Sequence, residues 1–421
     1  MALASGPWFT RKMRVPPNTW MRIAIIGGGI GGLTAALALK EFGFEAQIFE
    51  QAPQLLEVGA AILMWPNAMR VLHRLGVADT IREHGAVLEK ARWLKHDGKP
   101  LNNFSLPETE IPAVALHRAD LQQTLLHALP SASVHLNHIF QSYEQRPEGI
   151  IAHFQDAAAV ECDVLIAADG LHSRAREQLL HDGAPIEHSY AAWRGVMPHT
   201  PKSVALATAT EIYGRGRRFG IGPLGHGRVG WWASANKSLL TDTRASSTQA
   251  SPADHESMRA ELLRLFAGWC DPVRELISDT PSNALVRNPV CDRLPVRRWG
   301  EGCMTMLGDA VHPITPNLGQ GGCLAIEDAA VLARCFEKYA TKTTIAGTRA
   351  AVRDAWRRFE SVRYSRSAWV FRCSRIYGRV GQWETGIAVQ LRNRALSLVP
   401  TGLTKKFLRR VFDYDAYGRG I

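Results

Sequence analysis

The 421-residue sequence lacks the features of a membrane-spanning, disulfide-bonded or zinc-binding protein. It holds no apolar run of about 18 residues or more, so no transmembrane helix is expected. Its seven cysteines form no CxxC pair, and no HExxH pattern occurs among its 15 histidines. An odd number of unpatterned cysteines is typical of a reducing compartment. We therefore expect a cytoplasmic protein with no bound metal.

We expect neither a secretion signal nor a nucleic-acid-binding module in this sequence. Residues 1–20 are partly basic but have no apolar centre, which is unlike a secretion signal, so we expect a disordered extension there. Lys and Arg number 50 against 39 Asp and Glu, a net charge of +11. No nucleic-acid-binding pattern accompanies this excess. It leaves open a solvated basic helix face, an anionic membrane surface or an anionic cofactor.

A glycine motif occurs near the start of the sequence, in RIAIIGGGIGGLTAALALKEFGFEAQIFE (residues 22–50). Ile23 to Ile26 is a run suited to a buried parallel strand. Gly27, Gly29 and Gly32 follow as G-x-G-x-x-G, which gives a tight turn, close approach to a pyrophosphate and close helix packing. The phosphates would lie at a helix N-terminus, and Glu50, at the end of the second strand, would bind ribose hydroxyls. The pattern predicts a dinucleotide site and leaves FAD and NAD open.

Two acid–glycine pairs follow apolar strands later in the chain. The first begins DGLHSRAR at Asp169, with Ser173 and Arg176 at D-G-x-x-S-x-x-R spacing. Alone, it could be an ordinary Asp-Gly turn with Ser173 capping a helix. The second, Gly308-Asp309, follows the run MTML and precedes a segment rich in proline and glycine.

This order of motifs resembles the single-component FAD-dependent aromatic hydroxylases, the flavoprotein monooxygenases related to p-hydroxybenzoate hydroxylase. The resemblance extends from about Met21 to Tyr417 and includes WPNAMRVLHRLG, HRADLQQTLL and GDAVHPITPNLGQGGCLAIEDAAVLA. Within the family, PNLGQGGCLAIED is similar to zeaxanthin epoxidases, whereas AAWRGVMPH and VGQWE are similar to alkylquinolone 3-hydroxylases. The urate-hydroxylating branch is similar in outline.

The resemblance implies an α/β fold: a Rossmann-like FAD-binding domain, an inserted antiparallel β-sheet substrate domain and C-terminal helices. The expected FAD-binding domain is discontinuous, and the remaining parts fall around it. The expected boundaries are 21–75, 105–180 and 288–360 for the FAD-binding domain, 76–104 and 181–287 for the substrate domain, and 361–421 for the C-terminal helical segment.

The resemblance also implies the chemistry. NADH or NADPH would reduce FAD, and O₂ would form a flavin C4a-hydroperoxide that hydroxylates or epoxidises an aromatic, heteroaromatic or polyene small molecule. The protein would supply placement and dryness. No second G-x-G-x-x-G occurs, which fits a family without a separate NAD(P)H domain. An oxidase or reductase on the same fold, without oxygen insertion, is the alternative. We expect no nucleic-acid partner, and a monomer or a homodimer.

Site residues follow from the same resemblance. Asp309 would hold the ribityl chain, Arg118 would lie beside the pyrophosphate, and Arg176 would contact a flavin or nicotinamide phosphate. The expected cofactor-binding residues are Gly27, Gly29, Ile30, Gly31, Gly32, Glu50, Gln51, Arg118, Asp169, Gly170, Arg176, Asp309, Pro316, Gly319, Gly321 and Gly322. The residues expected nearest to the reacting ring are Pro316, Gly319, Gln320 and Gly321. No acid or base is certain among them, and His312 is open to a structural or a catalytic reading.

The substrate side is expected in the strand-rich segment 189–236 and in the proline–glycine segment. Trp231 and Trp232 are neighbours on a strand, so they face opposite sides and only one can line a cavity. The expected substrate-binding residues are Trp193, Arg194, Phe219, Trp231 and Asn317, and Arg217 is a further cation that an anionic substrate could pair with. The basic, amphipathic C-terminal segment would cover the flavin domain or rest on a membrane surface.

Overall fold

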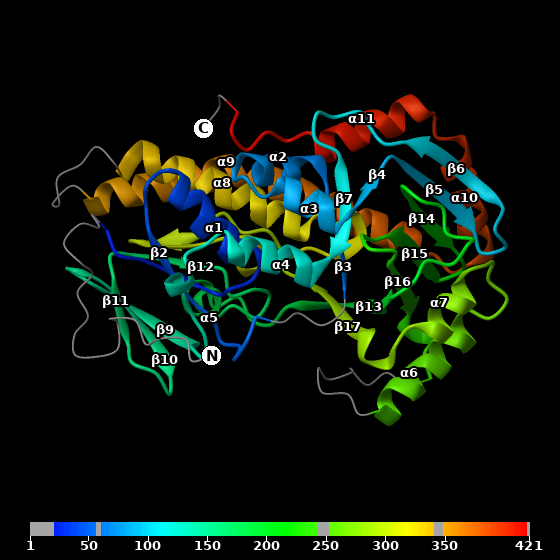
Figure 1. The fold of residues 1–421 in the computed structure, drawn as a ribbon, viewed down its shortest axis with the longest axis horizontal. Coiled ribbons are helices and arrows are strands. Elements are labelled where there is room, and N and C mark those ends of the chain that lie inside the picture. Colours follow the sequence, from blue (N-terminus) through cyan, green and yellow to red (C-terminus); the bar gives the residue numbers. More distant parts are fainter. Residues whose placement is uncertain (1–20, 56–59, 242–251, 341–347, 419–421) are drawn as a thin grey trace.

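The computed structural model describes residues 21–55, 60–241, 252–340 and 348–418. The extension expected at residues 1–20 lies outside the described residues. Within the described ranges, no helix is both long and apolar enough to cross a membrane. Figure 1 shows two regions side by side, one built on a parallel sheet and one on a larger, mainly antiparallel sheet.

The first region is built on a six-stranded sheet whose central strands are parallel. Strand β1 pairs with β12 on one side and β2 on the other, and all four residues of β1 are buried. Such apolar strands form because the sheet is covered by other elements, among them α1 (Ile30–Glu41) and strand β10 (Gly149–Gln155). The strand order is β18 (Gly300–Glu301), β19 (Met304–Met306), β12 (Val164–Ala167), β1 (Ile23–Ile26), β2 (Ala46–Phe49) and β8 (Val134–His135).

The second region is built on a seven-stranded sheet. Its strands pair antiparallel except β14 and β5, which run parallel. The strand order is β17 (Leu285–Asp292), β13 (Ile186–Met197), β16 (Val229–Asn236), β15 (Arg217–Pro223), β14 (Thr208–Tyr213), β5 (Lys90–Lys95) and β6 (Pro100–Ser105). The expected inserted sheet is therefore present, with two strands contributed from residues 90–105.

Two three-stranded sheets complete the strand inventory of the described residues. One lies at the edge of the parallel region and consists of β11 (Val160–Cys162), β10 (Gly149–Gln155) and β9 (Ile139–Arg146). The other connects the two regions and consists of β3 (Ala61–Met64), β7 (Ala113–His117) and β4 (Ala86–Leu88). Residues of this second sheet belong to the same buried core as β1 and β12.

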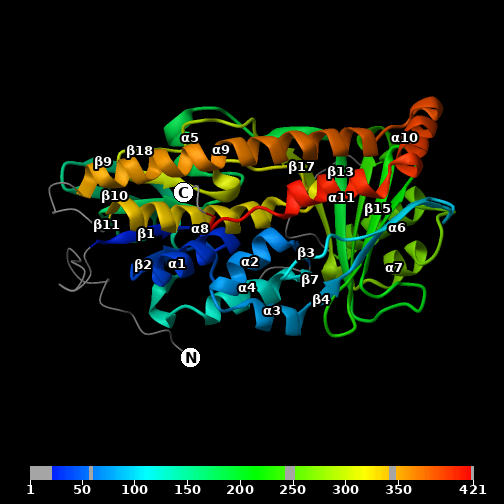
Figure 2. The ribbon, with the colours of Figure 1, turned by 90° about the horizontal axis from the view of Figure 1, so that it is seen from above.

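Helices cover the sheets and join the regions. Helix α1 is apolar on almost every side because it is buried against β1, α4 and α8. Figure 2 shows α9 extending along the molecule past both sheets. The helices are α1 (Ile30–Glu41), α2 (Pro66–Arg74), α3 (Ala78–His84), α4 (Arg118–His127), α5 (Arg174–Leu180), α6 (Pro252–Leu265), α7 (Val273–Asp279), α8 (Gly321–Ala340), α9 (Thr348–Gly381), α10 (Gly386–Leu398) and α11 (Thr401–Phe412).

Candidate active site

The turn between β1 and α1 is held very close to its neighbours. Gly27 has φ +102°, a conformation that side chains rarely adopt, and an added Cβ would lie 2.4 Å from the Ala168 carbonyl oxygen. A Cβ at Gly32 would lie 2.0 Å from the Gly27 carbonyl oxygen. No side chain fits at either position, so the two glycines allow α1 to start directly against the sheet.

The N-terminus of α1 is left open for an anion. Gly29 is the N-cap, without a side-chain cap, and an added Cβ would meet nothing within 4 Å. The first turn, which includes Ile30, Gly31 and Gly32, contains no acidic residue. The backbone N–H groups and the helix dipole therefore favour a negatively charged ligand here.

Glu50 lies beside this turn, at the end of β2. Its carboxylate accepts hydrogen bonds from the backbone N–H of Gly28 at 2.6 Å and of Ala52 at 2.9 Å. The next residue, Gln51, is exposed. From the other side, the Gln122 amide donates to the Gly28 carbonyl at 3.2 Å. These contacts fix Glu50 at the glycine turn, where a ribose attached to the phosphates would lie.

The Asp169-Gly170 turn follows β12 and faces the same edge of the sheet. One Asp169 oxygen, Oδ2, accepts from the Arg174 N–H at 2.9 Å, and Ser173 caps α5 through the Arg176 N–H at 2.9 Å. Oδ1 of Asp169 is buried and has no hydrogen-bond partner among the described residues. Burial raises the pKa of this carboxyl group. An unsatisfied buried acceptor beside an open Gly170 is what a hydroxyl- or amide-bearing ligand would complete.

The structure places the Arg176 side chain in contact with protein. Its guanidinium is fully buried, bonds Asp182 at 2.6 and 2.9 Å, and donates to the Val311 carbonyl at 2.5 Å. Arg176 therefore ties α5 to the loop after Gly308-Asp309. Its contact with a nucleotide phosphate stays a prediction.

Asp309 lies at the carboxyl end of β19, next to the starts of α1 and α8. Asp309 is exposed to solvent although many protein atoms surround its carboxyl group. This enclosure raises the pKa of Asp309, and the charges of His312, Arg118 and Arg194 oppose the rise. Arg118 begins α4, and its N–H donates to the Ala60 carbonyl at 2.9 Å. Hydroxyl groups that donate to Asp309 would therefore meet an acid already flanked by cations.

The loop before α8 provides a smooth, glycine-lined wall. Pro316 starts a short 3₁₀ turn that ends at Gly319, whose φ is +60°, and a Cβ at Gly321 would lie 3.8 Å from Asp309 Oδ1. Gly322 packs against Ile62, since an added Cβ would come within 3.2 Å of its side chain. The first turn of α8 has no acidic residue, so its dipole would stabilise negative charge on a ring lying there.

Gln320 connects this loop to a buried hydrogen-bond network. Its side chain is fully buried, and Oε1 accepts from Asn67 Nδ2 at 2.9 Å, while Nε2 has no partner among the described residues. Asn67 also donates to Glu327 at 2.6 Å. Sequence reasoning missed Asn67, whose only signal was its place in the WPNAM segment.

His312, for which the sequence left two readings, is a structural residue. Its Nε2 lies 2.5 Å from Asp328 Oδ2, and the ring is buried beside Trp299. The same carboxylate accepts from the Gly308 N–H at 2.9 Å. Burial opposes ionisation of Asp328, but the charges of His312 and Arg363 hold its pKa below the usual value. The pair therefore fixes the Gly308 turn.

The seven-stranded sheet has two faces with different roles. One face packs on α6 and α7 and carries Trp193, Phe219 and Trp231. Phe219 stacks on Trp231 with ring centroids 5.2 Å apart, and the Trp231 indole donates to Thr280 at 2.8 Å. These three aromatic residues are core packing, which corrects the expectation that they bind substrate. The helices that cover this face could not be assigned to it from strand alternation alone.

The opposite face carries the polar groups. Arg218, one residue beyond the Arg217 considered from sequence, is buried and pairs with Glu211 at 3.1 Å. Burial opposes its charge, yet the Glu211 carboxylate keeps the pKa of Arg218 above the usual value. Trp232 lies on this face, 5.2 Å from the Arg218 guanidinium, and its indole covers Gly220.

Asn317 joins the flavin-side loop to this face. Its Oδ1 accepts from Arg218, and its Nδ2 lies 3.0 Å from the Tyr190 hydroxyl and 2.8 Å from Thr315 Oγ1. Gly378 of α9 leaves room for the amide, because a Cβ there would lie 2.4 Å from Asn317 Nδ2. The amide is thus occupied by protein contacts that hold Arg218 and the loop together, and its contact with substrate stays a prediction.

A chain of hydroxyl groups extends from the same face. The Tyr213 and Tyr377 hydroxyl groups lie within hydrogen-bond distance of each other and of Glu211 Oε2. Each hydroxyl has one proton to donate, so when the two tyrosines bond each other only one of them donates to Glu211. Burial raises the pKa of both tyrosines well above the usual value. They therefore stay protonated at neutral pH, and the chain can pass a proton between hydroxyl groups and Glu211.

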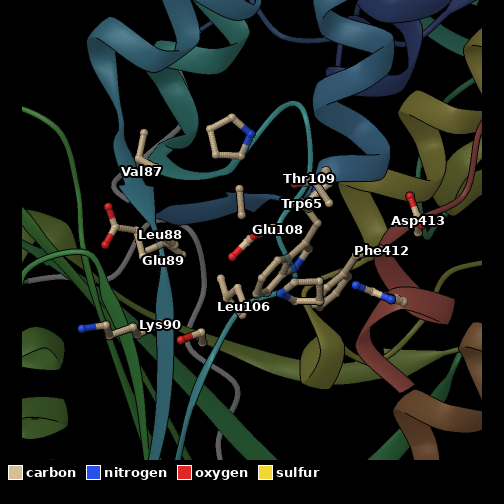
Figure 3. A pocket seen from close by; sticks show the side chains of 16 residues that line it. Trp65, Val87, Leu88, Glu89, Lys90, Leu106, Glu108, Thr109, Phe412 and Asp413 are labelled. Atoms are coloured by element: carbon tan, nitrogen blue, oxygen red, sulfur yellow. The ribbon is translucent and has the colours of Figure 1, made fainter. Parts of the chain in front are cut away.

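A cavity of about 410 Å³ lies nearby but is separate from these residues. Figure 3 shows it between β4, the β6–β7 loop and the end of α11, with Trp65 and Phe412 stacked 4.0 Å apart in its wall. Among the described residues that line it there is none of those predicted to bind cofactor. It touches the site through Trp65, because a Cβ at Gly319 would lie 3.1 Å from the Trp65 Nε1.

The parallel-sheet edge as a whole fits a flavin dinucleotide. An open helix N-terminus fits phosphates, and an acid at the end of β2 fits a ribose. Asp309 fits a ribityl chain, and the glycine wall before α8 fits a flat ring. Orphaned acceptor and donor atoms on Asp169 and Gln320 face no protein partner in the described part of the chain.

Comparison with known proteins gives the same answer. The model of the family described as "FAD binding domain" matches residues 21–343. The chain is 35% identical over 401 residues to the aurachin C monooxygenase/isomerase of Stigmatella aurantiaca, covering 94% of this chain and 99% of that protein. It is 31% identical to the 6-hydroxynicotinate 3-monooxygenase of Pseudomonas fluorescens, covering 75% and 83%. HpxO of Klebsiella pneumoniae, solved with FAD and uric acid, has a TM-score of 0.82 and 28% identity, covering 94% of this chain and 98% of its own.

The matched family and these relatives extend over both regions of the fold. The relatives named as monooxygenases also support oxygen insertion over the oxidase or reductase alternative. The chain belongs to the FAD binding domain family of aromatic hydroxylases and is an FAD-dependent monooxygenase.

Proposed function

We propose that this enzyme uses NADH or NADPH and O₂ to hydroxylate an electron-rich nitrogen heteroaromatic ring that carries an oxygen substituent. Two of the similar proteins are named for such substrates: 6-hydroxynicotinate and urate. The relative that matches over nearly the whole chain is named for aurachin C. These names supply the class of substrate, and the residues of the sheet face supply the reason to apply it here.

The observation that carries the proposal is the Arg218 side chain. It is buried on the sheet face that contacts the flavin-side loop through Asn317, and its Nε has no hydrogen-bond partner among the described residues. A buried guanidinium N–H without an acceptor is costly unless a ligand supplies one. The oxygen substituent of a heteroaromatic substrate is such an acceptor, and Trp232 beside Arg218 offers a flat apolar surface to the ring.

FAD, when bound, supplies the electron transfer and oxygen activation. The chain supplies the rest: Arg218 would orient the ring oxygen, and the glycine wall at Gly319 admits a flat group without a side chain between. The Tyr213–Tyr377–Glu211 chain can take up a proton that the substrate hydroxyl releases. Arg218 and Tyr213 are buried, so water would have little access to this part of the sheet face.

The test compares two adjacent arginines. Purified holoenzyme is screened with hydroxypyridines, quinolones and oxopurines for substrate-stimulated NAD(P)H oxidation, with ¹⁸O₂ incorporation measured by product mass. Arg218→Gln should raise KM or lower coupling by roughly 10- to 100-fold, since a hydrogen bond to a charged group is worth about 1.5–3 kcal/mol. Arg217→Gln is the control, because that side chain reaches the Leu265 carbonyl on the other face.

Two results would contradict the proposal. One is substrate-stimulated NAD(P)H oxidation by the wild type without one atom of labelled oxygen in the product. The other is an equal loss of activity in Arg217→Gln and Arg218→Gln at full FAD content. Because Arg218 is buried with Glu211, the double variant Glu211→Gln/Arg218→Gln separates a folding defect from a binding defect: it should regain thermal stability but not KM.

A further inference from the structure

Helix α10 presents its apolar residues outward and an arginine inward. Ile387, Leu391 and Leu398 are 85%, 62% and 68% exposed, whereas Arg392 is 1% exposed. The three apolar residues recur at helical spacing, so they lie on one face of the helix. Arg392 donates to the Gly381 carbonyl at 3.0 Å, which fixes this orientation. A surface helix of a soluble protein normally has the reverse arrangement.

Helix α11, the next helix along the chain, also exposes apolar side chains. Leu403 and Phe407 are 61% and 38% exposed, whereas Val411 and Phe412 pack into the core of the flavin region. We call Ile387, Leu391, Leu398, Leu403 and Phe407 together the terminal apolar face. These are five of the eleven large apolar side chains found exposed among the described residues, gathered in 21 residues of chain. Scattered exposed apolar residues need no explanation, but such a concentration indicates an interaction surface.

The two helices that carry the terminal apolar face have charges of one sign. Residues 385–412 contain six Arg and Lys and no Asp or Glu. Arg394, Lys406, Arg409 and Arg410 are exposed, and Lys405 is half-buried. Figures 1 and 2 show both helices at the end of the molecule that holds the seven-stranded sheet. A ligand of this surface must therefore combine an apolar layer with negative charge.

We propose that the terminal apolar face binds the surface of an anionic lipid bilayer, with Ile387, Leu391 and Leu398 entering the acyl boundary. Apolar side chains flanked by basic residues, on helices too short and too charged to span, are the pattern of helices that lie in a membrane interface. This inference goes beyond the proposed function and does not depend on it.

Other occupants fit less well. A second copy docked through the same patch would place like charges against each other, because a two-fold interface brings the same basic patch of both copies together. A nucleic acid would complement the basic residues but would leave the aliphatic stripe in water, since bases are bound by aromatic stacking and polar groups. The lipid surface satisfies both the apolar and the basic residues at once.

The experiment is vesicle flotation with the FAD-loaded full chain. Vesicles of phosphatidylcholine alone are compared with vesicles containing 30 mol% phosphatidylglycerol, at roughly 0.1 and 0.5 M NaCl, where the Debye length is about 10 Å and shorter. The wild type should bind the anionic vesicles, and salt should weaken this binding. Lys405→Gln/Lys406→Gln should bind about 30-fold more weakly, since each basic residue near an anionic surface contributes about 1 kcal/mol.

Matched variants separate the two parts of the surface. Lys202→Gln/Arg274→Gln removes two exposed charges from other elements and should bind like the wild type. Ile387→Ser/Leu391→Ser should lose at least about tenfold in binding while keeping its melting temperature, because both side chains are already exposed. Failure of the wild type to float with anionic vesicles would overturn the proposal, as would equal losses in the control variant. So would patch-dependent dimerisation, or RNA binding, in place of vesicle binding.

Discussion

The buried charge cluster behind the flavin-side loop allows one stability prediction with a worked magnitude. Arg363, Glu327 and Asp328 have fully buried side chains, and Arg363 pairs with the two carboxylates at 2.6 and 2.7 Å. Removing one partner of a buried ion pair costs about 3–5 kcal/mol because a charge is left uncompensated. After Arg363→Met, Arg366 still pairs with Glu327 and His312 with Asp328. We therefore expect the lower end, about 3 kcal/mol.

The assay is thermal unfolding of the FAD-free chain by circular dichroism. With about 2.1 cal/mol/K of unfolding entropy per residue, the 421 residues give roughly 0.9 kcal/mol/K, so Tm should fall by about 3 °C. FAD retention should fall as well, because Asp328 holds the Gly308 N–H next to the predicted ribityl ligand. Arg363→Lys keeps the positive charge, so its Tm should lie between the values for the wild type and Arg363→Met.

A control comes from the same helix. Arg357 pairs with Glu360 at 2.7 Å, but the Arg357 side chain is 60% exposed. Exposed pairs contribute less than about 1 kcal/mol, so Arg357→Met should lower Tm by about 1 °C at most. A Tm for Arg363→Met within 1 °C of the wild type, or an equal fall in the two variants, would show that the buried charges do not hold this region together.

Three further predictions test the cofactor region and its pH dependence. Asp309→Ala should weaken FAD retention, measured by the flavin remaining after gel filtration at low free FAD, and full occupancy would contradict the assigned role. Gly29→Ala should leave the FAD-free Tm unchanged but weaken FAD binding. Gly32→Ala should cost about 1–3 kcal/mol of stability through overpacking, or roughly 1–3 °C in Tm, because only the Cβ at Gly32 meets backbone. Burial opposes ionisation of Asp292 and Asp328, but partners hold both pKa values low. The stability that these two carboxylates contribute is complete above the unfolded pKa of about 3.9 and is lost as pH falls through the folded pKa. The urea midpoint should therefore fall when pH is lowered from 5 to 3. A midpoint that rises as pH is lowered over this range would contradict the assigned ion pairs.

The flavin half of the fold could be predicted from sequence because its signals are local. Gly27 and Gly32 follow one strand within a few residues, and Asp309 directly follows another, so strand–turn–helix geometry fixes their places. The structure also confirms the expected inserted sheet and C-terminal helices.

The substrate half could be predicted only up to the choice of face. Alternation shows that Trp231 and Trp232 point apart, and likewise Arg217 and Arg218, but not which face α6 and α7 cover. Those helices follow a long segment, so their docking side is set by tertiary packing and has no local signal. The sequence analysis therefore considered Arg217, whereas the buried arginine is its neighbour Arg218.

Trp65 links three places that sequence distance keeps apart. One face of its indole stacks on Phe412 at the end of α11, its ring lines the 410 Å³ cavity, and its Nε1 lies against the backbone at Gly319. Any ligand that draws α11 outward would therefore also change the support of the flavin-side loop. Such coupling is reciprocal by thermodynamic necessity. If lipid binding changes the affinity of the protein for FAD, then FAD binding changes its affinity for lipid by the same factor.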